Sequence, residues 1–322
     1  MDKQPSDGIL EEFRREFLDC WQRLPNKELF LVLFGAWLAL FHLVGNSTFG
    51  YIDTPSLLKW MYLTYKPKEN AIYDDGQGNL IPFLVAGLFW WKRKELMALE
   101  LKVWWPGLVL VVAGLVGHII GYVTQQPRIS IVGLFVGLYG LMGLAWGPSW
   151  LRASVFPFFL FAFCVPIGTF AEPVTFRLQL LVCQLVEWIA PLLAIDVLRH
   201  GTQLSDPTGQ YQYEVAAACS GIRSLVAIFV LAIVYGFISF PAAWKRLVVM
   251  GSAFPLAVLG NLARMMLIVI AAEIGGQSWG NYVHESSVFS MIPYIPAIGG
   301  LLLLGRFLGE GRRLPAKQQK SA

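Results

Sequence analysis

One short polar cluster inside an apolar run could carry out covalent chemistry. Residues 214–225 read Glu-Val-Ala-Ala-Ala-Cys-Ser-Gly-Ile-Arg-Ser-Leu and open a run that stays apolar to Ser239. Cys219 and Arg223 are four residues apart, so on a helix they share one face. A guanidinium beside a thiol favours the nucleophilic thiolate. Small residues also let two helices approach closely, so the segment taken alone favours helix packing over catalysis.

A second set of polar residues lies in the next apolar run and just beyond it. Asn261 and Arg264 are three residues apart and share a helix face, and His284 follows in a polar stretch. An arginine inside a membrane helix costs about 2.5–3.5 kcal/mol on insertion scales and usually marks function or a specific partner. The alternative for Arg264 is that its side chain snorkels to the headgroups. Together, a cysteine, a histidine and an arginine are the set that thiol acyl transfer needs.

The composition requires a membrane protein. Hydrophobic residues make up 56% of the 322 residues and charged residues 14%, against about 25% charged in soluble domains. We therefore expect an all-α polytopic protein, folded as a single bundle with interfacial amphipathic helices on its outer side. The net charge of +4 gives no reason to expect nucleic-acid binding. Four scattered cysteines have neither disulfide-framework nor metal-ligand spacing, so we expect no metal and no cofactor.

Eight spans are predicted. They cover residues 29–49, 80–91, 103–123, 129–146, 151–168, 215–239, 247–272 (with a kink at Pro255) and 288–307. Amphipathic or interfacial helices are expected at 9–24, 54–65 and 169–197, and residues 199–213 and 273–287 read as polar loops. Residues 1–27 form a cytoplasmic segment without a cleavage site, 28–309 the transmembrane domain with its catalytic part at 214–290, and 310–322 a basic tail.

Lysine and arginine fix the expected orientation. They gather in alternate connecting segments, and the positive-inside rule places those segments and both termini in the cytoplasm. If 169–197 crossed the membrane, Lys245 and Arg246 would fall on the wrong side. Cys219 and Arg223 then lie roughly 6–13 Å below the outer boundary, and Arg264 lies roughly 26 Å above its cytoplasmic start. With His284 in an outer loop, the sequence predicts one site at the outer face.

The residues of these clusters resemble the exosortase and archaeosortase family of membrane-embedded cysteine transpeptidases. The resemblance rests on the run from Glu214 to Leu225, with Pro-Leu-Ala at 255–257, Asn-Leu-Ala-Arg at 261–264, and His284. The span at 80–91 closed by Lys-Arg, and the Phe-Pro-Phe-Phe-Leu run at 156–160, are also similar. The C-terminal half matches in order and spacing, the N-terminal half mainly in span pattern. A histidine at position 284 is similar to the bacterial branch.

This resemblance implies roles that the residues alone leave open. Cys219 becomes the nucleophile, Arg264 the carbonyl stabiliser and His284 the acid and base. Arg223, Asn261, Ser220 and Glu214 are expected to support them. The implied substrate is a membrane-anchored protein with a C-terminal sorting signal: a short motif of Pro-Glu-Pro type, one transmembrane helix and a basic cluster. The implied location is the bacterial inner membrane with the site facing the periplasm, and the implied acceptor is a lipid or a glycan.

Other assignments stay open on the sequence. A transporter or lipid flippase would explain the spans and the intramembrane arginine but gives Cys219 no role. An envelope scaffold protein, or a hydrolase that cleaves without transfer, would share many of the same features. His200 is the main rival to His284, whereas His42 and His118 are lone histidines on apolar spans and read as structural.

Overall fold

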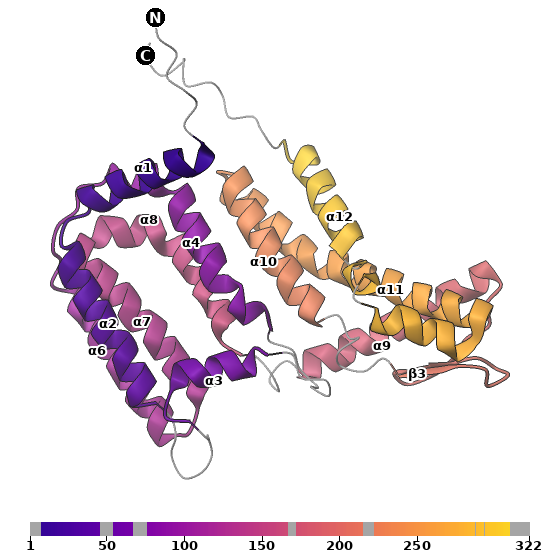
Figure 1. Cartoon of the computed structure of the whole chain (residues 1–322). Helices are drawn as coiled ribbons and strands as arrows, with labels where there is room; N and C mark the ends of the chain where they lie inside the picture. Colours follow the sequence, from indigo (N-terminus) through magenta and orange to yellow (C-terminus); the bar gives the residue numbers. More distant parts are fainter. Residues whose placement is uncertain are drawn as a thin grey trace, which may run out of the picture. The chain divides into compact units, whose positions relative to one another are not determined.

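The chain folds almost entirely into helices, as Figure 1 shows. The computed structural model describes residues 8–45, 54–66, 76–166, 172–214, 222–286, 288–292 and 294–309. Three of its helices are long and apolar enough to cross a membrane: Pro127–Trp146, Phe176–Leu193 and Ala243–Glu285. A fourth candidate is the pair Leu10–Arg23 and Lys27–Leu43, which is bent by 94°. The all-α membrane character is thus confirmed, while eight crossings stay a prediction.

Residues 176–193 belong to the segment for which the sequence favoured an interfacial position. By length and composition alone they could cross the membrane, so this part of the predicted topology remains open. The described residues cluster into two compact units, unit 1 within residues 1–66 and 75–166 and unit 2 within residues 167–322. The single bundle of spans stays a prediction.

Unit 1 is a helical assembly that contains the first five predicted spans. Its helices are α1 (Ile9–Arg23), α2 (Lys27–Leu43), α3 (Leu57–Thr64), α4 (Ile81–Trp91), α5 (Arg93–Met97), α6 (Gly107–Val123), α7 (Pro127–Trp146) and α8 (Pro148–Phe159), with short 3-10 turns at Gly76–Asn79 and Leu160–Cys164. The tightest packing joins α6 and α7, where a Cβ added at Gly114 would lie 2.6 Å from the Gly133 carbonyl oxygen. Glycine is required there because the two backbones nearly touch.

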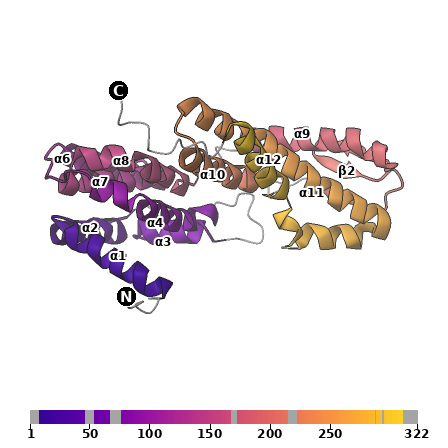
Figure 2. The ribbon, with the colours of Figure 1, turned by 90° about the horizontal axis from the view of Figure 1, so that it is seen from above.

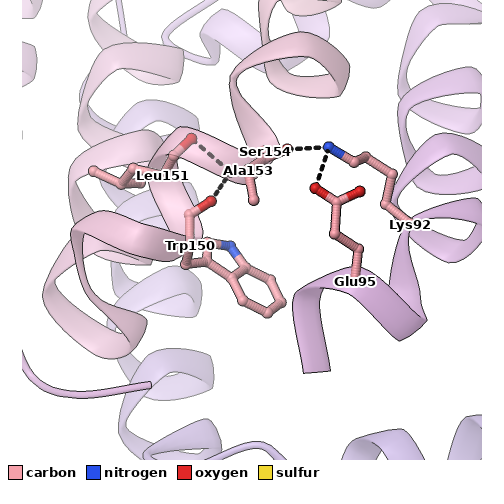
Figure 3. Close-up of polar contacts among 6 residues, drawn as sticks. All are labelled: Lys92, Glu95, Trp150, Leu151, Ala153 and Ser154. Carbon is pink, nitrogen blue, oxygen red and sulfur yellow. Dashed lines mark hydrogen bonds and ion pairs between the residues drawn. The ribbon is translucent and has the colours of Figure 1, made fainter. Parts of the chain in front are cut away.

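The basic residues that close α4 have a structural role within unit 1. Lys92 donates to the carbonyl of Ala153 in α8 and forms a 3.0 Å ion pair with Glu95 in α5 (Figure 3). Arg93 pairs with Glu16 of α1. These contacts join the α4–α5 junction to α1 and α8, so the cluster organises this unit in addition to any part it has in orienting the chain.

Unit 2 combines helices with a small sheet. Its elements are α9 (Glu172–Ile189), a 3-10 turn (Ala190–Leu193), β1 (Leu198–His200), β2 (Gln203–Ser205), β3 (Gln212–Glu214), α10 (Ile222–Ser239), α11 (Ala243–Glu285), a second 3-10 turn (Phe289–Met291) and α12 (Tyr294–Phe307). The strands pair antiparallel in the order β1-β2-β3, with Leu204 opposite Tyr213. The predicted polar loop at 199–213 is therefore wrong, because three-residue strands are too short to show an alternating pattern.

The longest helix, α11, differs from the prediction in a way that matters for function. Residues 273–285, expected as a loop, are helical, and α11 departs from helical dihedrals at Gly275 and Gly276 rather than at Pro255. Gly276 has φ 71°, a left-handed conformation that glycine adopts without the steric cost of a side chain. Figure 2 shows α11 turning back on itself, so it consists of two arms, 243–274 and 277–285.

Candidate active site

The two arms of α11 share one hydrophobic core with α9 and the sheet. The first arm contributes Met265, Ile268 and Val269, and the second arm contributes Val283. From the other elements come Val182, Cys183, Val186, Ala190, Leu204, Tyr211 and Tyr213. Because burial of these side chains stabilises the folded-back form of α11, the core fixes the second arm against the first.

Arg264 and His284 meet across the two arms. Nη2 of Arg264 donates to the backbone carbonyl oxygen of His284 at 3.1 Å. On a straight helix, residues 20 positions apart would be about 30 Å apart. The reversal at Gly275–Gly276 is therefore what brings the predicted carbonyl stabiliser beside the predicted acid and base. Both side chains are half-buried, which leaves part of each accessible.

Asn261 lies one turn before Arg264 on the first arm and is buried, with 2% of its surface exposed. Among the described residues its Nδ2 has no hydrogen-bond partner. Buried polar groups are nearly always hydrogen-bonded, so a buried amide nitrogen without a partner needs a functional explanation. Its position beside Arg264 agrees with the supporting role predicted from the sequence.

The electrostatic surroundings of His284 favour a neutral imidazole. Burial lowers its pKa below the ordinary value of 6.5, the positive charge of Arg264 lowers it further, and Glu285 opposes both effects. We treat residues 243–274 as the spanning part of α11, so His284 lies outside it. A neutral imidazole at neutral pH can accept a proton, as a base that activates a thiol must.

Four predicted site residues cannot be placed. Cys219 and Ser220 lie outside the described residues, as do the side chains of Glu214 and Arg223. Along the chain, Cys219 lies five residues after the end of β3 and three before the start of α10. Its proximity to Arg264 and His284 stays a prediction.

The other candidate histidine lies outside the core shared by the two arms of α11. His200 is exposed on β1, opposite Gln203 in β2. His118 is buried, with Nε2 2.8 Å from the carbonyl oxygen of Val44, which supports the structural role predicted for it. The choice of His284 over its main rival stays a prediction.

The described cysteines have structural surroundings. Cys183 is buried and donates to the carbonyl of Thr202 at 3.6 Å. Cys164 is also buried and donates to the carbonyl of Gly78 at 3.7 Å. Both are free thiols, and with Cys20 they are the only cysteines described. Within the described ranges, no three His, Cys, Asp or Glu side chains are grouped as metal ligands would be.

Sequence reasoning missed the residues that join the sheet to the second arm. The Gln277 side chain pairs with the backbone of Gln212 in β3, and the Tyr213 hydroxyl donates to the Gln277 carbonyl at 3.0 Å. The adjacent glycines at 275 and 276 were the available signal for a chain reversal. A glutamine in a presumed loop gave no comparable signal.

The geometry thus defines an all-α membrane protein with an arginine and a histidine gathered at a helix reversal. The profile of the transmembrane exosortases matches residues 71–299, which is more than half of the chain and includes Cys219, Arg264 and His284. The chain belongs to the transmembrane exosortase family. Comparisons with curated proteins and with solved structures gave no match. Membership supports an exosortase-type membrane transpeptidase in general and leaves the residues and the substrate to be argued.

Proposed function

We propose that the chain is a membrane-embedded cysteine endopeptidase and transpeptidase that acts on a C-terminal sorting signal. Cys219 is the nucleophile, Arg264 stabilises the oxyanion and His284 transfers protons. The observation that carries the proposal is the contact between Arg264 and His284, two residues 20 positions apart on one helix. The reversal brings the Arg264 guanidinium to the last turn of the arm that carries the His284 imidazole, and its positive charge lowers the pKa of that ring.

The first half of the reaction forms a thioester. Neutral His284 takes the proton of the Cys219 thiol, and the thiolate attacks the carbonyl carbon of the scissile peptide bond. Negative charge develops on the carbonyl oxygen, where the Arg264 guanidinium stabilises it. The carbon–nitrogen bond then breaks, and the imidazolium of His284 gives its proton to the leaving amine.

The second half releases the product. A nucleophilic group of the acceptor gives its proton to His284 and attacks the thioester carbonyl. The Cys219 thiolate then leaves and takes that proton back from the His284 imidazolium, which restores the starting state. A lipid or glycan acceptor gives transfer, whereas water gives hydrolysis. A guanidinium has five N–H groups, so one bond to the His284 carbonyl uses only one of them. In this proposal Arg223 either tunes the Cys219 thiolate or pairs with Glu214, while Asn261 and Ser220 support the site.

The proposed substrate suits a site at the membrane surface. A protein held by one transmembrane helix presents the residues before that helix at a fixed depth. Tethering both partners to one bilayer raises their effective concentration without further contacts. The proposed location is the outer face of the bacterial inner membrane, where the positive-inside rule puts the start of the sixth predicted span.

The test is processing of such a substrate in cells that express Cys219→Ala. The substrate is a protein ending in a Pro-Glu-Pro motif, one transmembrane helix and a basic cluster, and its cleavage is followed by gel mobility. We expect no processing by Cys219→Ala and near-normal processing by Cys183→Ala, the matched control for a buried thiol. Processing by Cys219→Ala at equal membrane abundance would refute the mechanism. The mass of the new C-terminus distinguishes transfer, which adds a group, from hydrolysis, which leaves a carboxylate.

A further inference from the structure

The strand that leads to Cys219 is bonded to the helix arm that carries His284. The Gln277 side-chain amide forms two hydrogen bonds with one residue of β3: the Gln212 N–H donates to Oε1 at 2.8 Å, and Nε2 donates to the Gln212 carbonyl at 3.3 Å. A single amide thus takes the place that a residue of a fourth strand would occupy. Both hydrogen-bonding groups of Gln212 on this edge are satisfied by it.

Neighbouring contacts fix the direction of that amide. Nε2 of Gln277 also donates to Oδ1 of Asn281, one turn later on the same arm, at 3.1 Å. The Tyr213 hydroxyl donates to the backbone carbonyl of Gln277 at 3.0 Å. The Tyr213 side chain approaches Gly280 so closely that a methyl group added there would collide with its hydroxyl. Strand and arm are therefore joined at two successive strand residues.

This junction connects two stretches of chain that carry the proposed site: the arm with His284 and the strand that precedes Cys219. Gln277 and His284 are seven residues apart on the second arm, which is about two helical turns. On the other side of the junction, β3 ends at Glu214 and Cys219 follows five residues later. A shift of the arm against the strand would move the end of β3, five residues before the proposed nucleophile, relative to the proposed base.

We propose that Gln277, held by Asn281 and backed by Tyr213, is a positioning residue that sets the Cys219 segment relative to His284 and Arg264. This inference rests on the proposed function. Gln277 contacts no reacting atom in this scheme, so it acts on the rate through geometry. A displacement of about 1 Å at a reacting centre can cost about a hundredfold in rate. Loss of the junction is therefore expected to lower the turnover rate strongly and to change substrate binding much less.

The experiment compares Gln277→Ala with Gln210→Ala, an exposed glutamine of the same hairpin. The first readout is substrate processing, separated into kcat and KM. The second is the pH profile of iodoacetamide alkylation in membranes, measured by mass spectrometry on the peptide that contains Cys219. For Gln277→Ala we expect kcat to fall about tenfold to a hundredfold with KM within threefold. We also expect the midpoint of the alkylation profile to move to higher pH, because the Cys219 thiol loses His284 as its base and Arg264 as its neighbouring cation.

Two further variants keep the test decisive if Gln277→Ala is poorly expressed. Gln277→Glu can still accept from the Gln212 N–H but cannot donate to its carbonyl. Tyr213→Phe keeps the ring beside Gly280 and loses only the bond to the Gln277 carbonyl, so its effect should be the smallest. Wild-type kcat together with a wild-type alkylation profile in Gln277→Ala or Gln277→Glu would overturn the inference. Alkylation needs no substrate, so this result is distinct from processing by Cys219→Ala, which would overturn the proposed function itself.

Discussion

The two units use the same kinds of polar residue in different ways. In unit 1, Nε2 of His118 lies 2.8 Å from the Val44 carbonyl oxygen, and Nε of Arg128 donates to the Pro166 carbonyl at 2.8 Å. Each of these contacts ends at a backbone group without acid–base chemistry. They stabilise helix ends and connections.

In unit 2 an arginine also donates to a backbone carbonyl, but that carbonyl belongs to a histidine. The Arg264–His284 contact therefore places a cation beside a titratable ring. The core that surrounds it includes Tyr213 of the strand before Cys219. Residue type alone therefore does not identify a functional site. A site is identified by a second chemical group that the fold brings to the same place.

Of the substitutions in this comparison, the removal of the His284 imidazole ring should cause the largest loss of activity. His284→Ala is expected to lower kcat/KM about a hundredfold to ten-thousandfold, the usual contribution of general acid–base catalysis. His118→Ala should leave the activity per folded molecule unchanged, because its contact is structural. Membrane abundance and substrate processing are measured together for both. Equal loss of activity per molecule in the two variants would remove the contrast between the units.

The pH dependence of kcat/KM in the wild-type enzyme should report the protonation of the same His284 ring. Because burial and Arg264 lower the pKa of His284 below 6.5, neutral imidazole persists to lower pH than in a free histidine. The acid limb of kcat/KM should therefore lie below pH 6.5, with activity falling as the ring becomes protonated. In Arg264→Gln the neighbouring charge is gone and the limb should move to higher pH. A limb that does not move would argue against coupling between the two residues.

Removing the guanidinium should have the next largest effect. Arg264→Ala is expected to lower kcat about a hundredfold to a thousandfold, as loss of an oxyanion donor does. Arg128→Ala is the matched control in unit 1 and should affect abundance rather than turnover. Arg223→Ala should be milder than Arg264→Ala. If Arg223→Ala is the more damaging at equal expression, the two arginines of unit 2 have been assigned in reverse.

The chain reversal can be tested against the tightest packing of unit 1. Gly276→Val forces a β-branched residue to φ 71°, which costs about 1–3 kcal/mol of strain and should lower kcat about tenfold. Gly133→Val overpacks the contact between α6 and α7, which costs a similar amount, about 1–3 kcal/mol. We expect Gly133→Val to lower the melting temperature without changing kcat per folded molecule. The opposite pattern would mean that the reversal does not serve the site.

The smallest effect is expected at the rival histidine. His200 is exposed on β1 and lies outside the core that holds the two arms. His200→Ala should therefore change kcat/KM less than about twofold, as surface substitutions usually do. A loss comparable with that of His284→Ala, in the same processing assay, would transfer the proton-transfer role to His200.

The sequence alone determined the membrane character, most helix positions and the choice of candidate residues. Long apolar runs form helices whatever surrounds them, so α4, α6, α7 and α10 appear close to their predicted places. Cysteine, arginine and histidine are chosen by their chemistry, which is a property of the residues themselves. The motif around Cys219 also carries the resemblance to the family that the profile match shows.

Only the tertiary structure decided how Arg264 and His284 come together. The sequence placed them at one depth through a span followed by a loop, whereas they meet through a helix that turns back at Gly276. That turn depends on the backbone dihedrals of Gly275 and Gly276 and on a core shared with α9 and the sheet, neither of which leaves a periodic pattern in the sequence. The bonds from Gln277 to β3 join residues 65 positions apart, and such a pairing depends on where the folded elements lie.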